Sequence, residues 1–188
     1  AAAMKALQVD DTLAEARTSL AFIKLHYDWD WPGAEEEFKR AIEMNPDYAN
    51  AHHWYSHYLM AMGRVEESLT ESQRAFELEP LVLVLNLHLG WHYFFARQYD
   101  QAIEHLRKTL ELEPNFEQAH RYLGWAYQEK EMYEEADTAL QRAISLFNGS
   151  IEAHALIGSV YALSKKRDKA QKVIDELKET GTRRYVSP

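Results

Sequence analysis

A motif that recurs every 34 residues constrains the fold of this 188-residue chain more than any other feature. Three similar stretches end at Pro46, Pro80 and Pro114, and Asn148 replaces the proline one period later. Proline has no backbone N–H and its φ is fixed, so each of these prolines marks the end of a helix. A repeat of this length predicts a row of small, similar units rather than one globular core.

Each unit also has a small residue and bulky apolar residues in constant positions. The small residues are Ser56, Gly90, Gly124 and Gly158, and they let the first helix of a unit approach its partner closely. The apolar residues around them recur at helical spacing. The pattern predicts two helices in each unit, over residues 12–27, 33–45, 49–62, 65–78, 83–96, 99–112, 117–130, 133–147, 151–164 and 167–180, with a further helix before Asp10.

The composition is that of a folded chain and excludes several function classes. The formal net charge is -9, and no basic run offers the cationic face that nucleic-acid binding requires. There is no cysteine, which excludes disulfides and thiolate metal sites. No apolar run approaches the roughly 20 residues that cross a bilayer, and no signal peptide is visible. We therefore expect a cytoplasmic protein that binds neither nucleic acid nor membrane.

The proline-ended stretches and the Leu-Gly-Trp sequences at 89–91 and 123–125 resemble the tetratricopeptide-repeat family. The resemblance covers nearly the whole chain, and it implies an all-α, right-handed α-solenoid of antiparallel helix pairs. It implies a single domain over 1–188, in which a truncated helix over 1–11 is followed by repeats over about 12–48, 49–82, 83–116, 117–150 and 151–181 and by the start of a missing helix over 182–188.

Two irregularities of the repeat lead to further expectations. The distance from Asp11 to Pro46 is one residue more than the period, and we place the extra residue in the connection Tyr27–Pro32. Gly181 is expected to close the last helix. Because no polar capping element is evident at that end, we expect the native protein to continue and the chain to self-associate through its uncapped ends.

In this family the first helix of each pair lines a concave groove, and the resemblance implies a peptide-binding surface there. Aromatic and arginine side chains are the usual anchors of such interfaces. The groove positions supply the candidates His53, Trp54, His57, His88, Trp91, Phe94, Phe95, Arg121, Tyr122 and Trp125. We expect His53, His57, Arg121 and Tyr122 to be exposed, whereas packing between helices and exposure both remain open for Trp91 and Trp125.

The histidines raise the question of a metal site. His53 and His57 are four residues apart on one helical face, as are His88 and His92, a spacing that can bind a divalent metal. A metal site would also need a carboxylate and an enclosed cavity, and the sequence specifies neither, so we predict no metal and no cofactor. No Gly-rich phosphate loop, nucleophile elbow or paired-carboxylate motif is present, so we do not expect an enzyme.

Three hypotheses for the function remain. The first is a scaffold for protein–protein interaction, which binds an apolar, partly acidic peptide or protein segment in the aromatic and histidine-rich groove. The second is a structural module that self-assembles. The third is a regulatory sensor segment of a larger bacterial protein, because residues 20–31 and 51–55 resemble repeats appended to bacterial signalling and transcription regulators.

Overall fold

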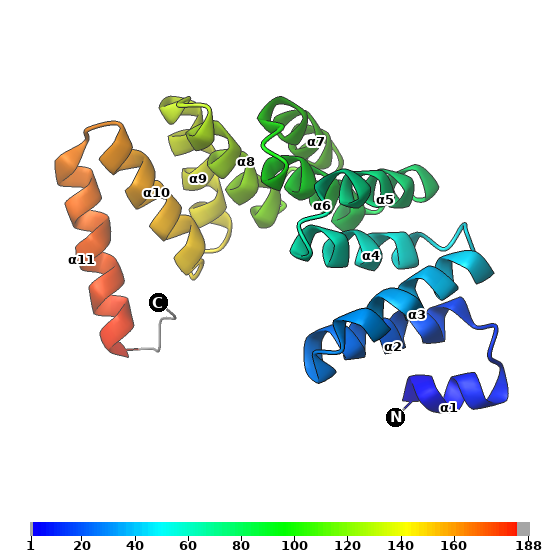
Figure 1. The fold of residues 1–188 in the computed structure, drawn as a ribbon. Coiled ribbons are helices and arrows are strands. Elements are labelled where there is room, and N and C mark those ends of the chain that lie inside the picture. Colours follow the sequence, from blue (N-terminus) through cyan, green and yellow to red (C-terminus); the bar gives the residue numbers. More distant parts are fainter. Residues whose placement is uncertain (1, 184–188) are drawn as a thin grey trace. The chain divides into compact units, whose positions relative to one another are not determined.

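The computed structural model of the chain describes residues 2–183, and all regular elements in this part are helical (Figure 1). No helix among them is long and apolar enough to cross a membrane. The helices are α1 (Ala2–Val9), α2 (Ala14–Ile23), the π-helix η1 (Lys24–Asp28), α3 (Trp31–Met44), α4 (Ala49–Ala61), α5 (Val65–Leu78), α6 (Leu83–Phe95), α7 (Tyr99–Leu112), α8 (Glu117–Glu129), α9 (Tyr133–Leu146), α10 (Ile151–Leu163) and α11 (Arg167–Arg183).

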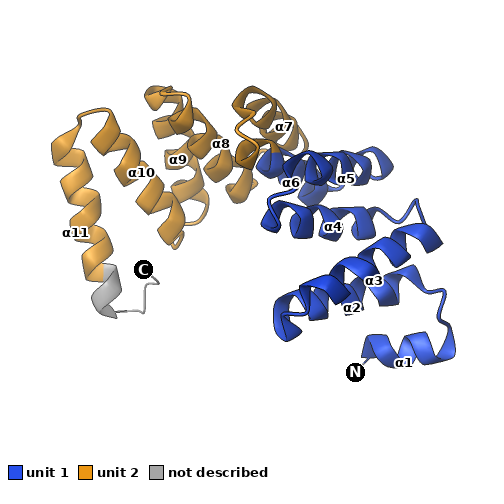
Figure 2. Ribbon diagram, viewed as in Figure 1, with its two compact units in different colours: residues 1–92 blue, residues 93–188 orange. Residues whose placement is uncertain are grey.

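The chain divides into two compact units, Ala1–His92 and Tyr93–Pro188 (Figure 2). In unit 1, α2 packs on α3 and α4 packs on α5; in unit 2, α8 packs on α9 and α10 packs on α11. The first helices of successive pairs, α4, α6, α8 and α10, begin 34 residues apart. The predicted all-α fold of paired helices is therefore confirmed, and most helix ends lie within one or two residues of their predicted positions.

Small residues allow the close packing of helix pairs, as predicted. A Cβ atom added at Gly124 in α8 would lie 2.5 Å from Cγ of Leu140 in α9, and Leu140 is fully buried. In unit 1 the equivalent residue, Ser56, is fully buried, and the Ser68 hydroxyl of α5 donates a hydrogen bond to its carbonyl oxygen at 2.8 Å. Close approach of the backbones is thus built into both units.

In three of the repeats, a polar side chain at the same position stabilises the turn that precedes the first helix of the pair. The ring Nε2 of His52 and that of His120 each donate to the carbonyl oxygen of the proline six residues earlier, both at 2.9 Å. Asn86 occupies the same position and donates from Nδ2 to the equivalent proline carbonyl at 2.7 Å. These side chains therefore serve the architecture of the repeat.

The extra residue of the first repeat is absorbed within a helix. The start of α2, Ala14, lies 35 residues before the start of α4. Trp29 and Gly63 are equivalent positions, both with a positive φ (56° and 73°), and they are 34 residues apart. The insertion therefore precedes Trp29 and produces the π-helical turn η1, which is how a helix accommodates one added residue. The predicted segment Tyr27–Pro32 overlaps η1 at Tyr27 and Asp28, but the extra residue is absorbed in a helical turn and not in a connection between helices.

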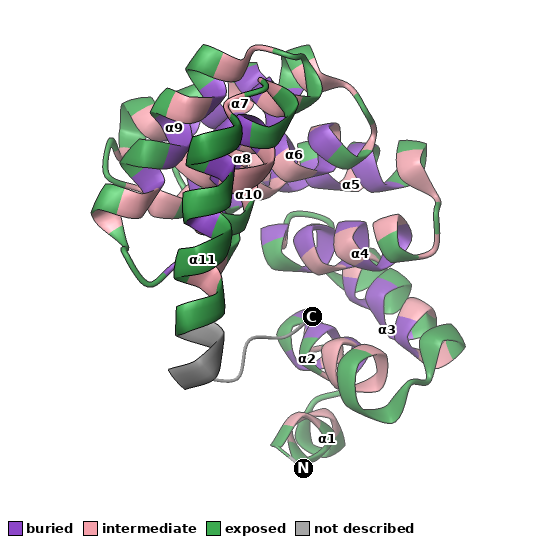
Figure 3. Ribbon diagram, turned by 90° about the vertical axis from the view of Figure 1, so that its left-hand side faces the viewer, coloured by how far each residue is buried: buried purple, intermediate pink, exposed green. Residues whose placement is uncertain are grey.

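The last helix differs from the prediction in two respects. It continues through Gly181 to Arg183, so Gly181 does not close it, and the rest of the predicted further helix, 184–188, lies outside the described residues. Among its described side chains, Ala170 and Val173 are buried, and most of the others are exposed (Figure 3). The exposed side chains are mainly charged, as on a capping helix, although Ile174 is 44% exposed.

Candidate functional site

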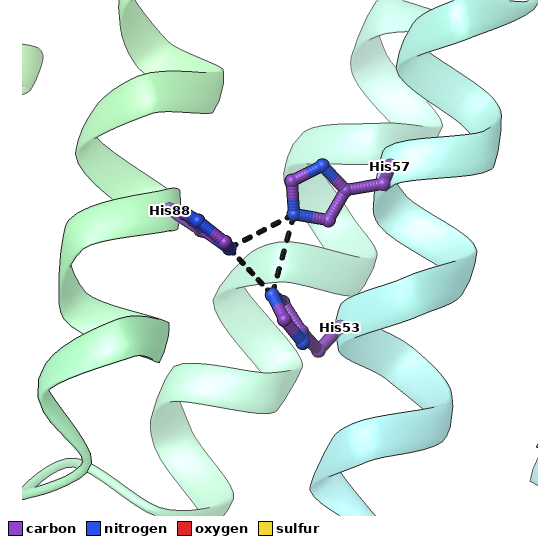
Figure 4. A group of neighbouring side chains, drawn as sticks. All are labelled: His53, His57 and His88. Carbon is purple, nitrogen blue, oxygen red and sulfur yellow. Dashed lines mark hydrogen bonds between the residues drawn. The ribbon is translucent and has the colours of Figure 1, made fainter.

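In unit 1, helices α4 and α6 bring three imidazole rings together (Figure 4). Nε2 of His53 lies 2.6 Å from Nδ1 of His88. Nε2 of His57 lies 3.0 Å from the same atom of His88 and 3.2 Å from Nε2 of His53. The helical spacing of four residues puts His53 and His57 on one face of α4, and the third ring comes from α6. We call these three residues the histidine cluster.

Burial keeps the histidine cluster neutral. Removal from water lowers the pKa of His53 to about 3, with smaller contributions from the other histidines nearby. The same cause lowers the pKa of His88 to about 4 and lowers that of His57 further. No carboxylate is among the groups that act on these pKa values. At neutral pH each ring therefore has one protonated nitrogen and one lone pair.

Aromatic side chains surround the histidine cluster. The Trp54 ring centroid is 4.8 Å from that of His53, and the Trp91 ring centroid is 5.2 Å from that of His57. His92 is fully buried and its ring lies 4.7 Å from that of His57. The cluster thus lies among packed rings, which excludes much of the surrounding water.

A pocket of about 370 Å³ lies beside Trp54, between α2 and α4. The Phe22 and Trp54 rings meet edge to face in its wall, with centroids 4.8 Å apart. None of its described lining residues is ionised. This volume is within the usual range of small-ligand pockets. We call it the α2–α4 pocket, and its lining consists of Thr18, Ser19, Phe22, Ile23, Tyr48, Asn50 and Trp54.

The candidates in unit 2 form two smaller groups. Trp125 contacts Phe94 and Phe95, with ring centroids 4.5 Å and 5.9 Å apart. The Arg121 guanidinium lies over the Tyr122 ring at 4.8 Å and makes an ion pair with Glu117 at 3.2 Å. Arg121 therefore already has an anionic partner within its own helix.

The burial of the candidates corrects part of the sequence analysis. His53 is only 3% exposed, because His88 and the Trp54 ring cover it, so the prediction that it is exposed was wrong. His57, Arg121 and Tyr122 are half-buried, as are Trp54, His88, Trp91 and Trp125. Phe94 is buried, whereas Phe95 is 43% exposed. For Trp91 and Trp125, packing and partial exposure therefore coexist.

Sequence reasoning missed Phe22, which supplies one wall of the α2–α4 pocket. With the 35-residue offset of the first repeat, Phe22 is the equivalent of His57. The signal was therefore present in the sequence, but it appears only when the inserted residue is placed before Trp29. Tyr48, which precedes α4, was also missed because it lies outside the predicted first helix.

Comparisons with known proteins agree with this architecture. Residues 95–160 match the family described as tetratricopeptide repeat. The structure of PilW, described as a widely conserved type IV pilus biogenesis factor, is similar with a TM-score of 0.87 and 20% identity, covering 97% of this chain and 84% of that chain. MamA from Desulfovibrio magneticus RS-1 has a TM-score of 0.80 and 18% identity, covering 92% and 97%.

A third similar structure is that of YrrB, described as a tetratricopeptide-repeat protein with an unusual peptide-binding site. Its TM-score is 0.71 at 20% identity, and the match covers 94% of this chain and 91% of that chain. No curated protein sequence matches this chain. Residues 95–160 thus match the tetratricopeptide-repeat family, and the described residues have the fold of these solved structures.

Proposed function

We propose that this chain is a non-catalytic scaffold that binds an apolar segment of a partner protein in the α2–α4 pocket. The observation that carries the proposal is the pocket itself, in which Phe22 and Trp54 form an aromatic wall at the edge of the packed core. Arrays of this fold generally bind partners along the surfaces of their repeats. YrrB, which is similar in fold, is described as having a peptide-binding site, and this supports the same class of ligand.

The chemistry of the lining suggests an uncharged anchor. Phe22, Ile23, Tyr48 and Trp54 offer mainly apolar surface, and no ionised side chain is among the lining residues. Asn50 is exposed at the edge, where its amide can bond to a peptide backbone. We therefore propose an aliphatic or aromatic side chain of the partner as the group that enters the pocket.

The acidic character that the sequence suggested for the ligand finds no support. That expectation depended on Arg121 and on the histidines as cationic groups. Arg121 is paired with Glu117. Burial holds the pKa of His53 and that of His88 well below neutrality, so these rings carry no charge to attract a carboxylate.

The proposal can be tested with peptides selected on the wild-type protein from a random phage-displayed library. We expect the selected peptides to share an aliphatic or aromatic anchor. Phe22→Ala should weaken their binding by tenfold or more, because a truncated hot-spot residue costs about 2 kcal/mol. Asn50→Arg places a charge at the pocket edge without removing core contacts, and it should weaken binding to a similar extent.

A matched control is available in the same unit. Trp31 is 43% exposed and does not line the pocket, so Trp31→Ala should leave peptide affinity within twofold of the wild-type value. Circular dichroism would verify that each variant is folded. If folded Asn50→Arg and Phe22→Ala proteins bind the peptides as tightly as the wild type does, the α2–α4 pocket is not the binding site.

A further inference from the structure

Three ring nitrogens that all face one another cannot all be paired by hydrogen bonds. Each of the three contacts in the histidine cluster would need one N–H and one lone pair. A neutral ring nitrogen is either a donor or an acceptor, so among three mutually facing nitrogens at least two are of the same kind. Protonation of a ring adds a donor and does not remove the conflict. One contact at 3.2 Å or less therefore always joins two like groups.

A metal cation at the centre of the triangle would resolve this conflict, because it accepts all three lone pairs at once. The three potential ligand atoms lie within 4.8 Å of one another. In a tetrahedral site with metal–nitrogen distances of about 2.0–2.1 Å, ligand nitrogens are about 3.3 Å apart. The present separations of 2.6, 3.0 and 3.2 Å require only a small outward movement of the rings.

We propose that His53, His57 and His88 form a binding site for a divalent transition-metal ion, with zinc as the best candidate. The ligands would be Nε2 of His53, Nε2 of His57 and Nδ1 of His88. Three imidazoles without a carboxylate suit zinc, copper or nickel, whereas calcium and magnesium require oxygen ligands. Three protein ligands leave the fourth position of a tetrahedral ion open to water or an external group.

The surroundings of the histidine cluster set the expected affinity. Metal-bound histidines usually donate their second N–H to a carboxylate or carbonyl group, and loss of such a partner weakens metal binding about 10- to 100-fold. Nδ1 of His53 is buried and makes no hydrogen bond among the described residues. Packing against Trp54 therefore holds this ring. We expect a dissociation constant between about 0.1 and 10 µM, weaker than that of a typical structural zinc site.

The site would connect two successive repeats. Two ligands come from α4 and the third comes from α6, so the ion would join two helices. His92 packs against His57, and neither of its ring nitrogens makes a hydrogen bond within the described part of the chain. Burial lowers its pKa, and the nearby backbone of His88 opposes this effect more weakly. We assign His92 to the buried wall of the site and not to the ligands.

The test is an isothermal calorimetric titration of the tag-free, metal-stripped full chain with zinc at pH 7.5. The proposal predicts one zinc ion per chain with a dissociation constant below about 10 µM. His57→Ala and His88→Ala should each weaken binding by at least tenfold. The matched control is His120→Ala, which removes a histidine of unit 2 that bonds to a backbone carbonyl, and it should leave the affinity within twofold.

A second readout keeps the proposal falsifiable where an alanine variant does not fold. Cobalt bound to the wild type should give the intense visible absorption of a four-coordinate site, and the milder variant His57→Gln should abolish it. Zinc should also raise the Tm of the wild type and of His120→Ala equally. The proposal is overturned if the wild type binds zinc with a dissociation constant above about 10 µM or not at all, or if folded His57→Gln and His88→Ala proteins bind zinc as the wild type does.

Discussion

Nε2 of His53 in α4 lies 2.6 Å from Nδ1 of His88 in α6, so two imidazole rings meet where successive first helices of the array pack. Apolar or small side chains could fill this place without any need for hydrogen bonds. Polar groups there impose a definite orientation on both helices, since a buried nitrogen without a partner is costly. The histidine cluster therefore depends on the correct rotation of α4 and α6, and its chemistry reports on that rotation.

Glu35 is the centre of an ion-pair network in unit 1, and its replacement should destabilise the fold in a pH-dependent way. Lys39 and Arg64 contact Oε1 of Glu35 at 2.8 and 2.6 Å, and they lower its pKa to about 2. Because the pKa is lower in the folded state than its ordinary value of 4.5, the stabilisation is fully present above pH 4.5. It is lost as the pH falls from 4.5 to about 2.

We expect Glu35→Gln to reduce the free energy of unfolding by about 1–2 kcal/mol at pH 7, a value discounted for the screening of a partly exposed carboxylate. The loss should approach zero near pH 2. Urea unfolding at a series of pH values measures it. Glu36→Gln is the matched control, since Glu36 is exposed and, among the described residues, pairs only with Arg40 of its own helix; it should cost less than about 0.5 kcal/mol. A pH-independent loss for Glu35→Gln would contradict this explanation.

Two glycines should respond to alanine with opposite signs. An added Cβ at Gly124 would lie 2.5 Å from Cγ of the fully buried Leu140, and overpacking of this kind costs about 1–3 kcal/mol. At Gly158 the nearest atom is Cγ1 of Val173 at 3.1 Å, which a small shift can relieve. There the gain in helix propensity, up to about 1 kcal/mol, should dominate.

Thermal unfolding of the two alanine variants tests this contrast. Gly124→Ala should lower the Tm, and Gly158→Ala should leave it unchanged or raise it. Combining Gly124→Ala with Leu140→Val should destabilise the protein by less than the sum of the two single changes. The smaller valine relieves the overpacking by the added methyl group, and that methyl group fills part of the cavity left by valine. Equal effects of the two glycine substitutions would show that close helix packing at Gly124 is not a constraint.

The π-helical turn η1 predicts that one residue can be deleted from the first repeat. Tyr27 lies in η1 and is 73% exposed, so its deletion should convert the turn to α-helix and restore the 34-residue spacing. We expect a change in unfolding free energy below about 1 kcal/mol. Deletion of Ala61 from α4, which has no π-helical turn to absorb the loss, should cost more than about 3 kcal/mol. Urea unfolding of both deletion variants measures the two losses of free energy. Equal losses would contradict the conclusion that η1 contains an inserted residue.

Helix positions could be predicted from the sequence because their ends depend on local chemistry. The prolines at 46, 80 and 114 each follow a helix, and the structure ends α3, α5 and α7 two residues before them. A helix end of this kind needs no knowledge of tertiary contacts. Gly181 shows the limit of the rule, because a glycine can also continue a helix, and α11 runs past it.

The candidate site depended on information that spacing does not contain. The separation of His53 and His57 places both on one face of α4, but the rotation of α6 decides that His88, and not His92, brings a ring nitrogen to theirs. The same rotation covers His53, which we expected to be exposed. Phe22 was missed for a different reason, since one inserted residue shifts the register of the first repeat. Local pattern thus predicted the elements, and helix rotation determined the site.

Binding of a partner segment between α2 and α4 can be tested directly by photo-crosslinking. A library-selected peptide whose apolar anchor is replaced by a benzophenone-bearing residue would be irradiated with the wild-type chain, and the labelled residues mapped by mass spectrometry. The proposed function predicts crosslinks to the residues around Phe22 in α2 and Trp54 in α4, and their loss in Asn50→Arg. Crosslinks confined to unit 2, or to α3 and α5, would contradict it.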